Sequence, residues 1–578
     1  MKMNEHVKFI FAFSLFLLVA GFFIHLPSEL GSSLAIPPDS NEYSICLANL
    51  FEHGKFGFTL NGEWYPSRYA PWFSLLCLTP AYLLFWGDIL SLHWAVLAFA
   101  LLFLVMSYKF ARLAGLEKWS FVCAVIPLFI PDFVYYSRLV MTEIPYAAIL
   151  ALSAIAFVRL ANAKSPSLKF CFGAGALVAW AGAVRASGLP MLGLFAVVLL
   201  FKKTGLWRKV VSALVLSIPA IAYEAANLIY NKCVFGSPFR SGYHFWVSVP
   251  CDYPDMTFNF EYALSNVSEY LHEPITLVAL ALSVVIAVVA LLMLRGRFGG
   301  VDTNKGFLWL SSYVLLQGFV LFSLYIGYYW CDVRFFLPFM LCEIPLFLRA
   351  AVVIVGEGKV RKTIFMSVSL AVCAGGFRLV APRYYFISNH YPIRIAEAAV
   401  SREVLPSGAV VVQDGNPAFM DCMGQRGKRL EFLPVYRRFD YVNAMVAPFS
   451  ISEFGPKPES WHQRIVPELV SNGVCKLPFP VTLTEDHTVI DRYLESGRRV
   501  FLHYGIFFNP NVNGTNAALS LLDRFDMKLF GTWTVPAIEP NPVRHIYDRF
   551  LLWNCSMDSR LEVQCIYYEI LPKSAGSN

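Results

Sequence analysis

Long apolar runs fill the first two thirds of the chain and constrain its fold more than any other feature. A membrane-spanning helix needs about 20 predominantly apolar residues, with some tolerance for short or tilted segments. Of the 578 residues 57% are hydrophobic and only 15% are charged, against about 25% charged in soluble domains. This composition excludes a single soluble core, a disordered chain and a secreted disulfide scaffold. Eleven runs predict spanning helices of a polytopic α-helical membrane protein: 9–26, 91–110, 119–135, 144–161, 170–184, 187–201, 210–230, 275–294, 306–327, 335–352 and 363–381.

The basic residues predict how these helices are oriented. A further apolar run, 71–87, is short and contains Pro71 and Pro80. If it lies in the membrane interface and the N-terminus is cytoplasmic, 18 basic residues fall in cytoplasmic loops and 7 in outer loops. A spanning 71–87 would invert every later loop and destroy this bias. The positive-inside rule therefore predicts eleven spans, an interfacial helix in the first outer loop and an outer C-terminal part.

The C-terminal part, residues 382–578, has a different composition from the rest. Its 20 basic and 20 acidic residues balance, so the net charge of +7 belongs to residues 1–381, where it indicates topology rather than nucleic-acid binding. β-Branched and aromatic runs bounded by turn residues predict strands, and helical periodicity lies between them. We expect a small extracytoplasmic α/β domain with strands at 408–413, 499–504, 528–535 and 561–568 and helices at 393–404 and 516–525.

Charged and aromatic side chains recur on the predicted outer side of the membrane domain. The first outer loop contains Asp39-Ser-Asn-Glu42-Tyr43 and, later, Arg68-Tyr-Ala-Pro-Trp. Acids gathered in outer loops and at outer helix ends suggest a site on that face. Four further features follow in order: Glu143 in Met-Thr-Glu-Ile-Pro, Arg185 in Val-Arg-Ala-Ser-Gly, Arg240 and His244 in a Gly-rich loop that starts at Phe235, and Arg334 in Cys-Asp-Val-Arg-Phe.

In their order and common side, these motifs resemble the GT-C superfamily of membrane glycosyltransferases, in particular the bacterial branch similar to protein O-mannosyltransferases and aminoarabinose transferases. The resemblance covers residues 1–381, and residues 382–578 resemble no family. It implies an inverting glycosyltransferase that moves a hexosyl or pentosyl group from a polyprenyl-phosphate donor to a lipid, glycan or protein acceptor. The expected place is the outer face of the bacterial cytoplasmic (inner) membrane, with the bilayer, donor and acceptor as partners and no nucleic acid.

The resemblance also implies roles for the marked residues. Asp39 would be the general base, a role typically worth roughly 10²–10⁴-fold in rate, and Glu143 a second catalytic carboxylate. Arginine offers a planar, bidentate fork to phosphate. The family is divided on metal use, so no cofactor is certain, and His244 is the candidate ligand of a divalent cation. Substrate and phosphate binding would fall to Glu42, Tyr43, Arg68, Arg185, Arg240 and Arg334.

Plainer roles compete with each of these. Asp39 fits a helix N-cap, Glu42 a solvated acid, and Glu143 a first-turn charge favoured by the helix dipole. Arg185 and Arg334 could snorkel to the interface from helix ends, and a lone His244 among aromatic residues could simply stack. For the whole protein, the alternatives are a polytopic transporter or flippase, against which the lack of inverted repeats counts, and a non-catalytic envelope-assembly protein.

Overall fold

The protein is described here from a computed structural model. The described residues are 38–61, 63–87, 89–137, 139–239, 241–242, 260–272, 274–295, 305–327, 333–356, 400–413, 430–434, 488–505, 519–536 and 562–573, with single positions between 358 and 369 and at 483 and 486. The predicted first span, 9–26, lies outside these residues, as does most of 363–381 and the predicted domain boundary after 381.

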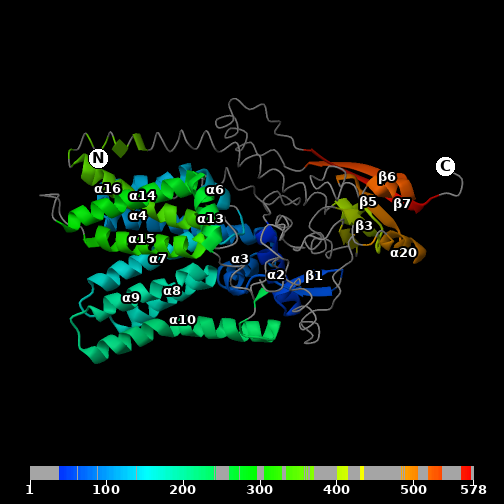
Figure 1. Cartoon of the computed structure of the whole chain (residues 1–578). Helices are drawn as coiled ribbons and strands as arrows, with labels where there is room; N and C mark the ends of the chain where they lie inside the picture. The colour runs from blue at the N-terminus through cyan, green and yellow to red at the C-terminus, as the bar shows by residue number, and fades with distance from the viewer. Residues whose placement is uncertain are drawn as a thin grey trace.

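A bundle of apolar helices forms the body of the molecule (Figure 1). Within the described residues, six helices are long and apolar enough to cross a membrane. Each coincides with a predicted span, because a run of some 20 apolar residues can satisfy its main-chain groups in lipid only as a helix. They are α4 (His93–Leu113), α7 (Glu143–Asn162), α10 (Leu206–Phe235), α14 (Pro274–Leu294), α15 (Lys305–Ile326) and α16 (Leu337–Val355).

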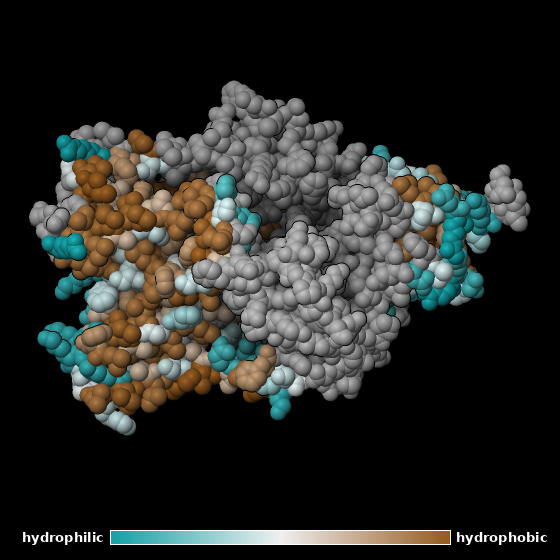
Figure 2. Space-filling view, viewed as in Figure 1, coloured by the Kyte–Doolittle hydropathy of each residue, from teal (hydrophilic) through white to brown (hydrophobic). Residues whose placement is uncertain are grey.

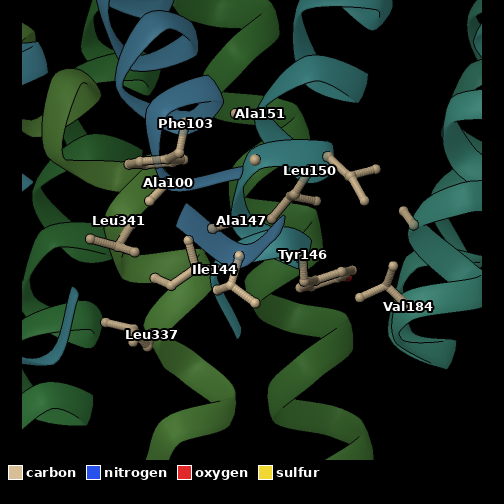
Figure 3. Packing of buried hydrophobic residues seen from close by; sticks show 14 of the residues in the cluster. Ala100, Phe103, Ile144, Tyr146, Ala147, Leu150, Ala151, Val184, Leu337 and Leu341 are labelled. Atoms are coloured by element: carbon tan, nitrogen blue, oxygen red, sulfur yellow. The ribbon is translucent and has the colours of Figure 1, made fainter. Parts of the chain in front are cut away.

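Helix α7 is the centre of the bundle and packs against α4, α8 (Leu168–Val184), α15 and α16. Small side chains such as Ala147 and Ala151 allow its neighbours to approach closely, and Figure 3 shows them facing Leu341 of α16 and Ala100 of α4. Close approach is also seen between α8 and α10, where a Cβ on Gly175 would lie 1.9 Å from the main-chain oxygen of Leu216.

The outer helices expose apolar side chains over the flank of the bundle (Figure 2). On α10 these include Leu214, Ile218 and Ile221, and on α14 Val284 and Leu291, which are each half exposed or more. An apolar surface of this extent would be unfavourable in water and is suited to lipid. The molecule is therefore a multi-pass membrane protein, as the sequence predicted, although the count of eleven spans remains a prediction.

Two of the apolar runs are divided into short helices. The run 119–135 is divided into α5 (Ser120–Val125), η4 (Ile126–Phe129) and α6 (Pro131–Tyr136), because Pro127 and Pro131 each remove a main-chain donor. The run 71–87 forms only η1 (Ser74–Leu78) and α3 (Thr79–Leu84), too short to span. Its tip exposes Trp86 to 96%, in keeping with the predicted interfacial position.

The predicted first outer loop is ordered by one helix and one hairpin. Helix α2 (Pro38–His53) is followed by the antiparallel strands β1 (Gly57–Leu60) and β2 (Glu63–Pro66). Asn49 of α2 donates its side-chain N–H to the carbonyl of Gly57, which fixes the hairpin to the helix. Elsewhere in the bundle, helix α9 (Met191–Leu200) falls within the predicted run 187–201, whereas helix α13 (Phe260–His272) was not predicted.

The C-terminal part contains a five-stranded mixed sheet of order β4-β3-β5-β7-β6. Strands β3 (Val410–Gln413), β5 (Val500–His503), β6 (Phe525–Pro536) and β7 (Glu562–Pro572) confirm the four predicted strands, whereas β4 (Glu431–Pro434) was missed. Strand β3 pairs parallel with β4 and β5, and β7 pairs antiparallel with β5 and β6. A short helix, α20 (Val489–Glu495), packs its buried Val489 and Ile490 on one face.

Candidate functional site

Two buried carboxylates project from the start of α2. Asp39 and Glu42 are three residues apart and so lie on one side of the helix. They are only 6% and 1% exposed. A buried carboxylate is costly unless hydrogen bonds or opposite charges compensate it, and the surrounding loops supply both.

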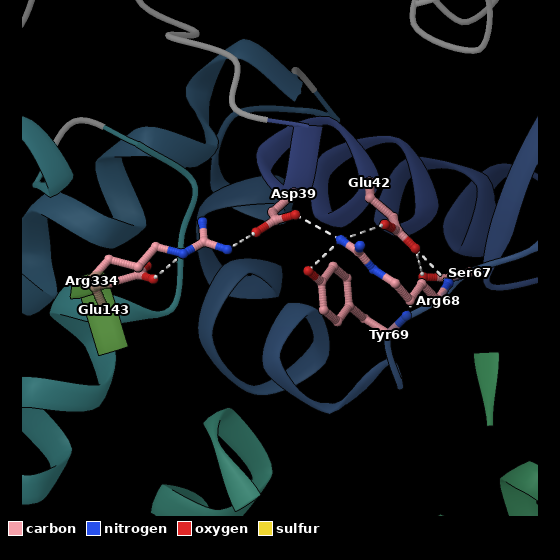
Figure 4. A network of polar contacts seen from close by, with 7 residues as sticks. All are labelled: Asp39, Glu42, Ser67, Arg68, Tyr69, Glu143 and Arg334. Atoms are coloured by element: carbon pink, nitrogen blue, oxygen red, sulfur yellow. Dashed lines mark hydrogen bonds and ion pairs between the residues drawn. The ribbon is translucent and has the colours of Figure 1, made fainter. Parts of the chain in front are cut away.

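Arg68 and its neighbours compensate Glu42 and one oxygen of Asp39 (Figure 4). The chain enters this position directly from β2, and Nη2 of Arg68 lies 2.7 Å from Oδ1 of Asp39 and 3.6 Å from Oε2 of Glu42. The hydroxyl of Ser67 and the main-chain N–H of Arg68 both donate to Oε1 of Glu42. Tyr69 accepts a hydrogen bond from Arg68 Nη2 and stacks on the ring of Tyr43. Glu42 therefore fixes the loop that carries Arg68.

Arg334 compensates the second oxygen of Asp39 and links it to the next acid. Its Nη2 lies 2.8 Å from Oδ2 of Asp39, and its Nε lies 3.6 Å from Oε1 of Glu143. The same Glu143 oxygen accepts a hydrogen bond from Nη2 of Arg185. The six side chains form one series of alternating charge, Glu42–Arg68–Asp39–Arg334–Glu143–Arg185, with three acids and three arginines.

Segments far apart in the chain meet in this series. Glu143 opens α7, Arg185 follows the end of α8, and Arg334 lies in η6 (Val333–Phe336) just before α16. The ring of Phe335 lies under both guanidinium groups, 5.0 Å from that of Arg185 and 5.5 Å from that of Arg334. Arg185 also donates through Nε to the hydroxyl of Thr142 at 3.0 Å. Two arginines held close together in this way favour an anion.

The two carboxylates of α2 differ in their affinity for protons. Burial by itself raises the pKa of Asp39, but the positive charges of Arg334 and Arg68 outweigh it and lower the pKa to about 2. For Glu42 burial prevails over the charge of Arg68 and the hydrogen bonds from Ser67 and Arg68, so its pKa is raised. A pair of acids whose pKa values are moved apart is a common arrangement in active sites.

The Gly-rich loop after α10 touches the site through Gly242. A Cβ at this position would lie 2.1 Å from the main-chain oxygen of Ser67 and 2.4 Å from Cα of Arg68. Only glycine permits this approach, and it presses the loop against the backbone of Arg68. The predicted site residues Arg240 and His244 lie outside the described residues.

A second polar network lies one helical turn deeper, beneath Glu143 and Arg185. The hydroxyl of Tyr146 accepts hydrogen bonds from Nε2 of Gln317 (2.7 Å) and from the hydroxyl of Ser187 (3.2 Å). Gln317 Nε2 also donates to the carbonyl of Ser187 at 3.2 Å. These bonds tie α7 and α15 to the segment that follows Arg185.

Several of the plainer roles considered for these residues are wrong. Glu42 is buried and bonded rather than solvated, and Arg185 turns inward to Glu143 rather than toward the interface. Both oxygens of Asp39 face arginines, which favours a charged role over a cap. Glu143 lies in the first turn of α7, as predicted, yet its side chain is fully buried. Tyr43 packs on Tyr69 and Phe73, so its proposed substrate contact remains a prediction.

The sequence did not mark four residues that complete the site: Ser67, Tyr69, Thr142 and Phe335. Each is adjacent in the chain to a charged residue that was marked, and this adjacency is the signal by which they could have been found. For a metal, no group of three His, Cys, Asp or Glu side chains is suitably placed within the part of the chain that the structure describes. The acids of the site contact guanidinium groups instead.

Helical bundle, outer-loop helix and C-terminal sheet together have the GT-C-like fold. No family model and no curated protein matches the sequence. Among solved structures, the chain is similar to ArnT from Cupriavidus metallidurans bound to undecaprenyl phosphate, with 12% identity, 98% of each chain covered and a TM-score of 0.53. The apo state of the same ArnT gives 12% identity, 97% of each chain and a TM-score of 0.51. The Archaeoglobus fulgidus oligosaccharyltransferase in complex with Zn and sulfate is 12% identical to this chain and gives a TM-score of 0.44. The match covers 86% of this chain and 68% of that chain.

Proposed function

We propose that the protein is a GT-C glycosyltransferase that transfers a sugar from a polyprenyl-phosphate donor to an acceptor nucleophile on the outer face of the membrane. One observation carries the proposal: a buried carboxylate, Asp39, has each of its oxygens held by a different arginine, Arg68 and Arg334. Buried ion pairs contribute little net stability compared with apolar packing, and they gather at functional sites. The fold shared with an ArnT that was solved with undecaprenyl phosphate supports this choice of donor.

Arg334 is the proposed first contact for the donor phosphate. Its side chain is 21% exposed, whereas those of Arg68 and Arg185 are 9% exposed. Nη1 of Arg185 is buried and makes no hydrogen bond within the described residues. It can therefore donate to an oxygen of a phosphate held between Arg185 and Arg334. Charge-assisted bonds from paired guanidinium groups suit a phosphate that gains charge as it leaves.

Asp39 is the proposed general base, and donor binding would make it a stronger base by raising its pKa. A carboxylate with a pKa of about 2 is ionised at neutral pH but accepts protons weakly. When a phosphate draws Arg334 away, only Arg68 and the hydrogen bond with Tyr69 still oppose the effect of burial, and the pKa of Asp39 rises. Asp39 then takes the proton of the acceptor, the acceptor atom bonds to the anomeric carbon, and the bond from that carbon to the phosphate oxygen breaks with its electron pair on the lipid phosphate. The configuration at the anomeric carbon inverts.

The test compares two replacements of Asp39 with a matched control. The donor is the lipid-linked sugar that accumulates in membranes when the gene is deleted, and transfer is measured with purified protein in detergent. Asp39→Asn keeps an oxygen acceptor but loses the charge, so we expect transfer to fall by about 10²-fold or more with the folded yield retained. Asp491 likewise lies in the first turn of a helix and pairs with an arginine, Arg524, and Asp491→Asn should leave transfer unchanged.

Full activity in Asp39→Asn, with loss only in Asp39→Ala, would refute the catalytic role. A transporter or flippase is tested with the same lipid and the protein reconstituted in liposomes. If the protein in liposomes moves the accumulated lipid across the bilayer without releasing its sugar to any acceptor, the glycosyltransferase assignment is wrong. If the protein neither moves the lipid nor transfers its sugar, the remaining alternative is a non-catalytic envelope-assembly protein.

A further inference from the structure

The tip of the hairpin in the first outer loop is bonded to the C-terminal sheet. Asn61 joins β1 to β2, and its side-chain amide makes two reciprocal bonds with one residue of β4. Nδ2 of Asn61 donates to the carbonyl of Phe432 at 3.0 Å, and the N–H of Phe432 donates to Oδ1 of Asn61 at 2.9 Å. One amide thus uses its donor and its acceptor on the main-chain groups of a single residue, as a residue of a neighbouring antiparallel strand would.

The geometry of β4 explains why Phe432 is the partner. Strand β4 is at the edge of the sheet and pairs only with β3 among the described strands. The N–H of Glu431 donates toward β3, to Ala409, so the next residue turns its own main-chain groups to the open side. Unpaired groups on a strand edge are a liability, and Asn61 satisfies both of those on Phe432. The side chain of Phe432 is 1% exposed, so this point of the edge is packed as well as bonded.

The conformation of Asn61 restricts which residues can make this contact. Its φ is +54°, in the left-handed region that asparagine and glycine enter at low cost. The sequence Asn-Gly between two strands is the usual signal for a tight hairpin turn. Asparagine therefore serves both the turn and the bonds to β4, whereas glycine could serve only the turn.

The hairpin leads directly into the charged site. Strand β2 ends at Pro66, and the next two residues are Ser67 and Arg68, which bind Glu42 and Asp39. At its other end, Gly57 is tied to α2 through Asn49. The position of the tip therefore affects the position of Arg68 through β2, a strand of four residues that pairs with β1. Strand β1 is in turn fixed to α2 at its base. In Figure 1, β1 extends from α2 toward the end of the molecule that holds the C-terminal sheet.

We propose that the C-terminal domain braces the active site through the Asn61–Phe432 contact, and that Asn61 is a positioning residue for Arg68. This contact would give the C-terminal domain a role in the active site, although the domain contributes no described residue to the charged series. The contact itself does not depend on the proposed function, and only the activity measurement below rests on it.

Hydrogen exchange of the full chain in detergent tests the brace directly. Asn61→Gly keeps the turn and removes both bonds, so peptides covering 57–66 and 430–434 should exchange about tenfold faster than in the parent. Leu529, 54% exposed on the opposite edge strand β6, provides a control, since Leu529→Ser should leave both peptides unchanged. Parental exchange in Asn61→Gly would overturn the proposal.

A second variant separates the bonds from any general loosening. In Asn61→Asp the ionised carboxylate accepts from the N–H of Phe432 but repels its carbonyl, whereas the protonated carboxyl restores both bonds. Relative to the parent at each pH, exchange in Asn61→Asp should therefore slow as the pH falls through about 4, while Asn61→Gly stays fast. An equal pH response in the two variants would also overturn the proposal.

Activity provides the final measurement. If Asn61 positions Arg68, Asn61→Gly should lower kcat for sugar transfer with little change in the KM of the donor, and Asn61→Asp should recover part of kcat relative to Asn61→Gly at low pH. A rise in KM alone would contradict a positioning role. Absence of transfer in every protein, the parent included, would refute the proposed function, while the exchange data would still decide on the brace.

Discussion

Removal of Arg334 should change how the stability of the protein depends on pH. The pKa of Asp39 is lowered from its usual 3.8 to about 2, with burial opposing the change and Arg334 and Arg68 causing it. Each pKa unit corresponds to about 1.4 kcal/mol, so the charged form of Asp39 stabilises the fold by roughly 2 kcal/mol. Because the folded-state pKa is depressed, this stabilisation is fully present above about pH 4 and is lost as the pH falls toward 2.

In Arg334→Gln, only Arg68 and the hydrogen bond with Tyr69 still oppose the effect of burial on the pKa of Asp39. The pKa of Asp39 should then return to its usual value or above it, and the acid-side loss of stability that belongs to Asp39 should vanish or reverse. The measurement is unfolding of detergent-purified protein between pH 7 and pH 2.5, followed by tryptophan fluorescence, for the parent, Arg334→Gln, Asp39→Asn and the double variant. At pH 7 the double-mutant cycle should give a coupling of about 2 kcal/mol between the two residues.

The comparison with Asp39→Asn isolates the titration of this one group from the other acids. The parent should lose about 1 kcal/mol relative to Asp39→Asn between pH 4 and pH 2.5, whereas Asp39→Asn and the double variant should run in parallel. If the parent and Asp39→Asn lose stability together over that range, Asp39 does not carry a depressed pKa. The electrostatic reasoning for the base would then be refuted.

Two further predictions concern the packing around the site. Gly242→Ala places a Cβ against the backbone of Ser67 and Arg68. We expect the free energy of unfolding to fall by about 1–3 kcal/mol and sugar transfer to fall at least tenfold. Gly193 has open space around it, so Gly193→Ala should change neither quantity in the same assays. Gln317→Leu removes the Gln317 donor from the buried Ser187 carbonyl and the shorter of two hydrogen bonds to the Tyr146 hydroxyl, and thermal unfolding should show a loss of about 1–3 kcal/mol. Ser312→Ala on the exposed side of the same helix should cost little, and an equal loss in both variants would show that the deeper network has no special value.

The sequence predicted the spanning helices well and the short elements poorly. Each long helix corresponds to an apolar run, because lipid leaves the main chain no alternative to internal hydrogen bonding. By contrast, β4 has only four residues, Glu431–Pro434, with a charged residue at one end and proline at the other, and local preference cannot identify such a segment. Its place in the sheet comes from pairing with β3 and from Asn61, both distant in the chain.

For the candidate site, the sequence identified the charged residues but not the partners that they contact. Acids and arginines on one predicted face could be identified from the chain, but their pairing could not. Arg334 reaches Asp39 only because α16 packs beside α7 at the centre of the bundle. Glu42 was expected to be solvated because an acid in a first turn usually is. It is buried because the segment after β2 passes directly over it.

The balance of charge in the site follows from where the site lies. Three acids and three arginines at the end of an apolar bundle can remain ionised because each charge has an opposite neighbour. Such a series is neutral as a whole, so under the proposed function a donor phosphate that binds Arg334 would displace a carboxylate from it. Arg334 is the most exposed arginine of the three and bridges Asp39 to Glu143. If the proposed function is correct, binding of the donor and activation of the base are therefore one event, since the phosphate that takes Arg334 is also what raises the pKa of Asp39.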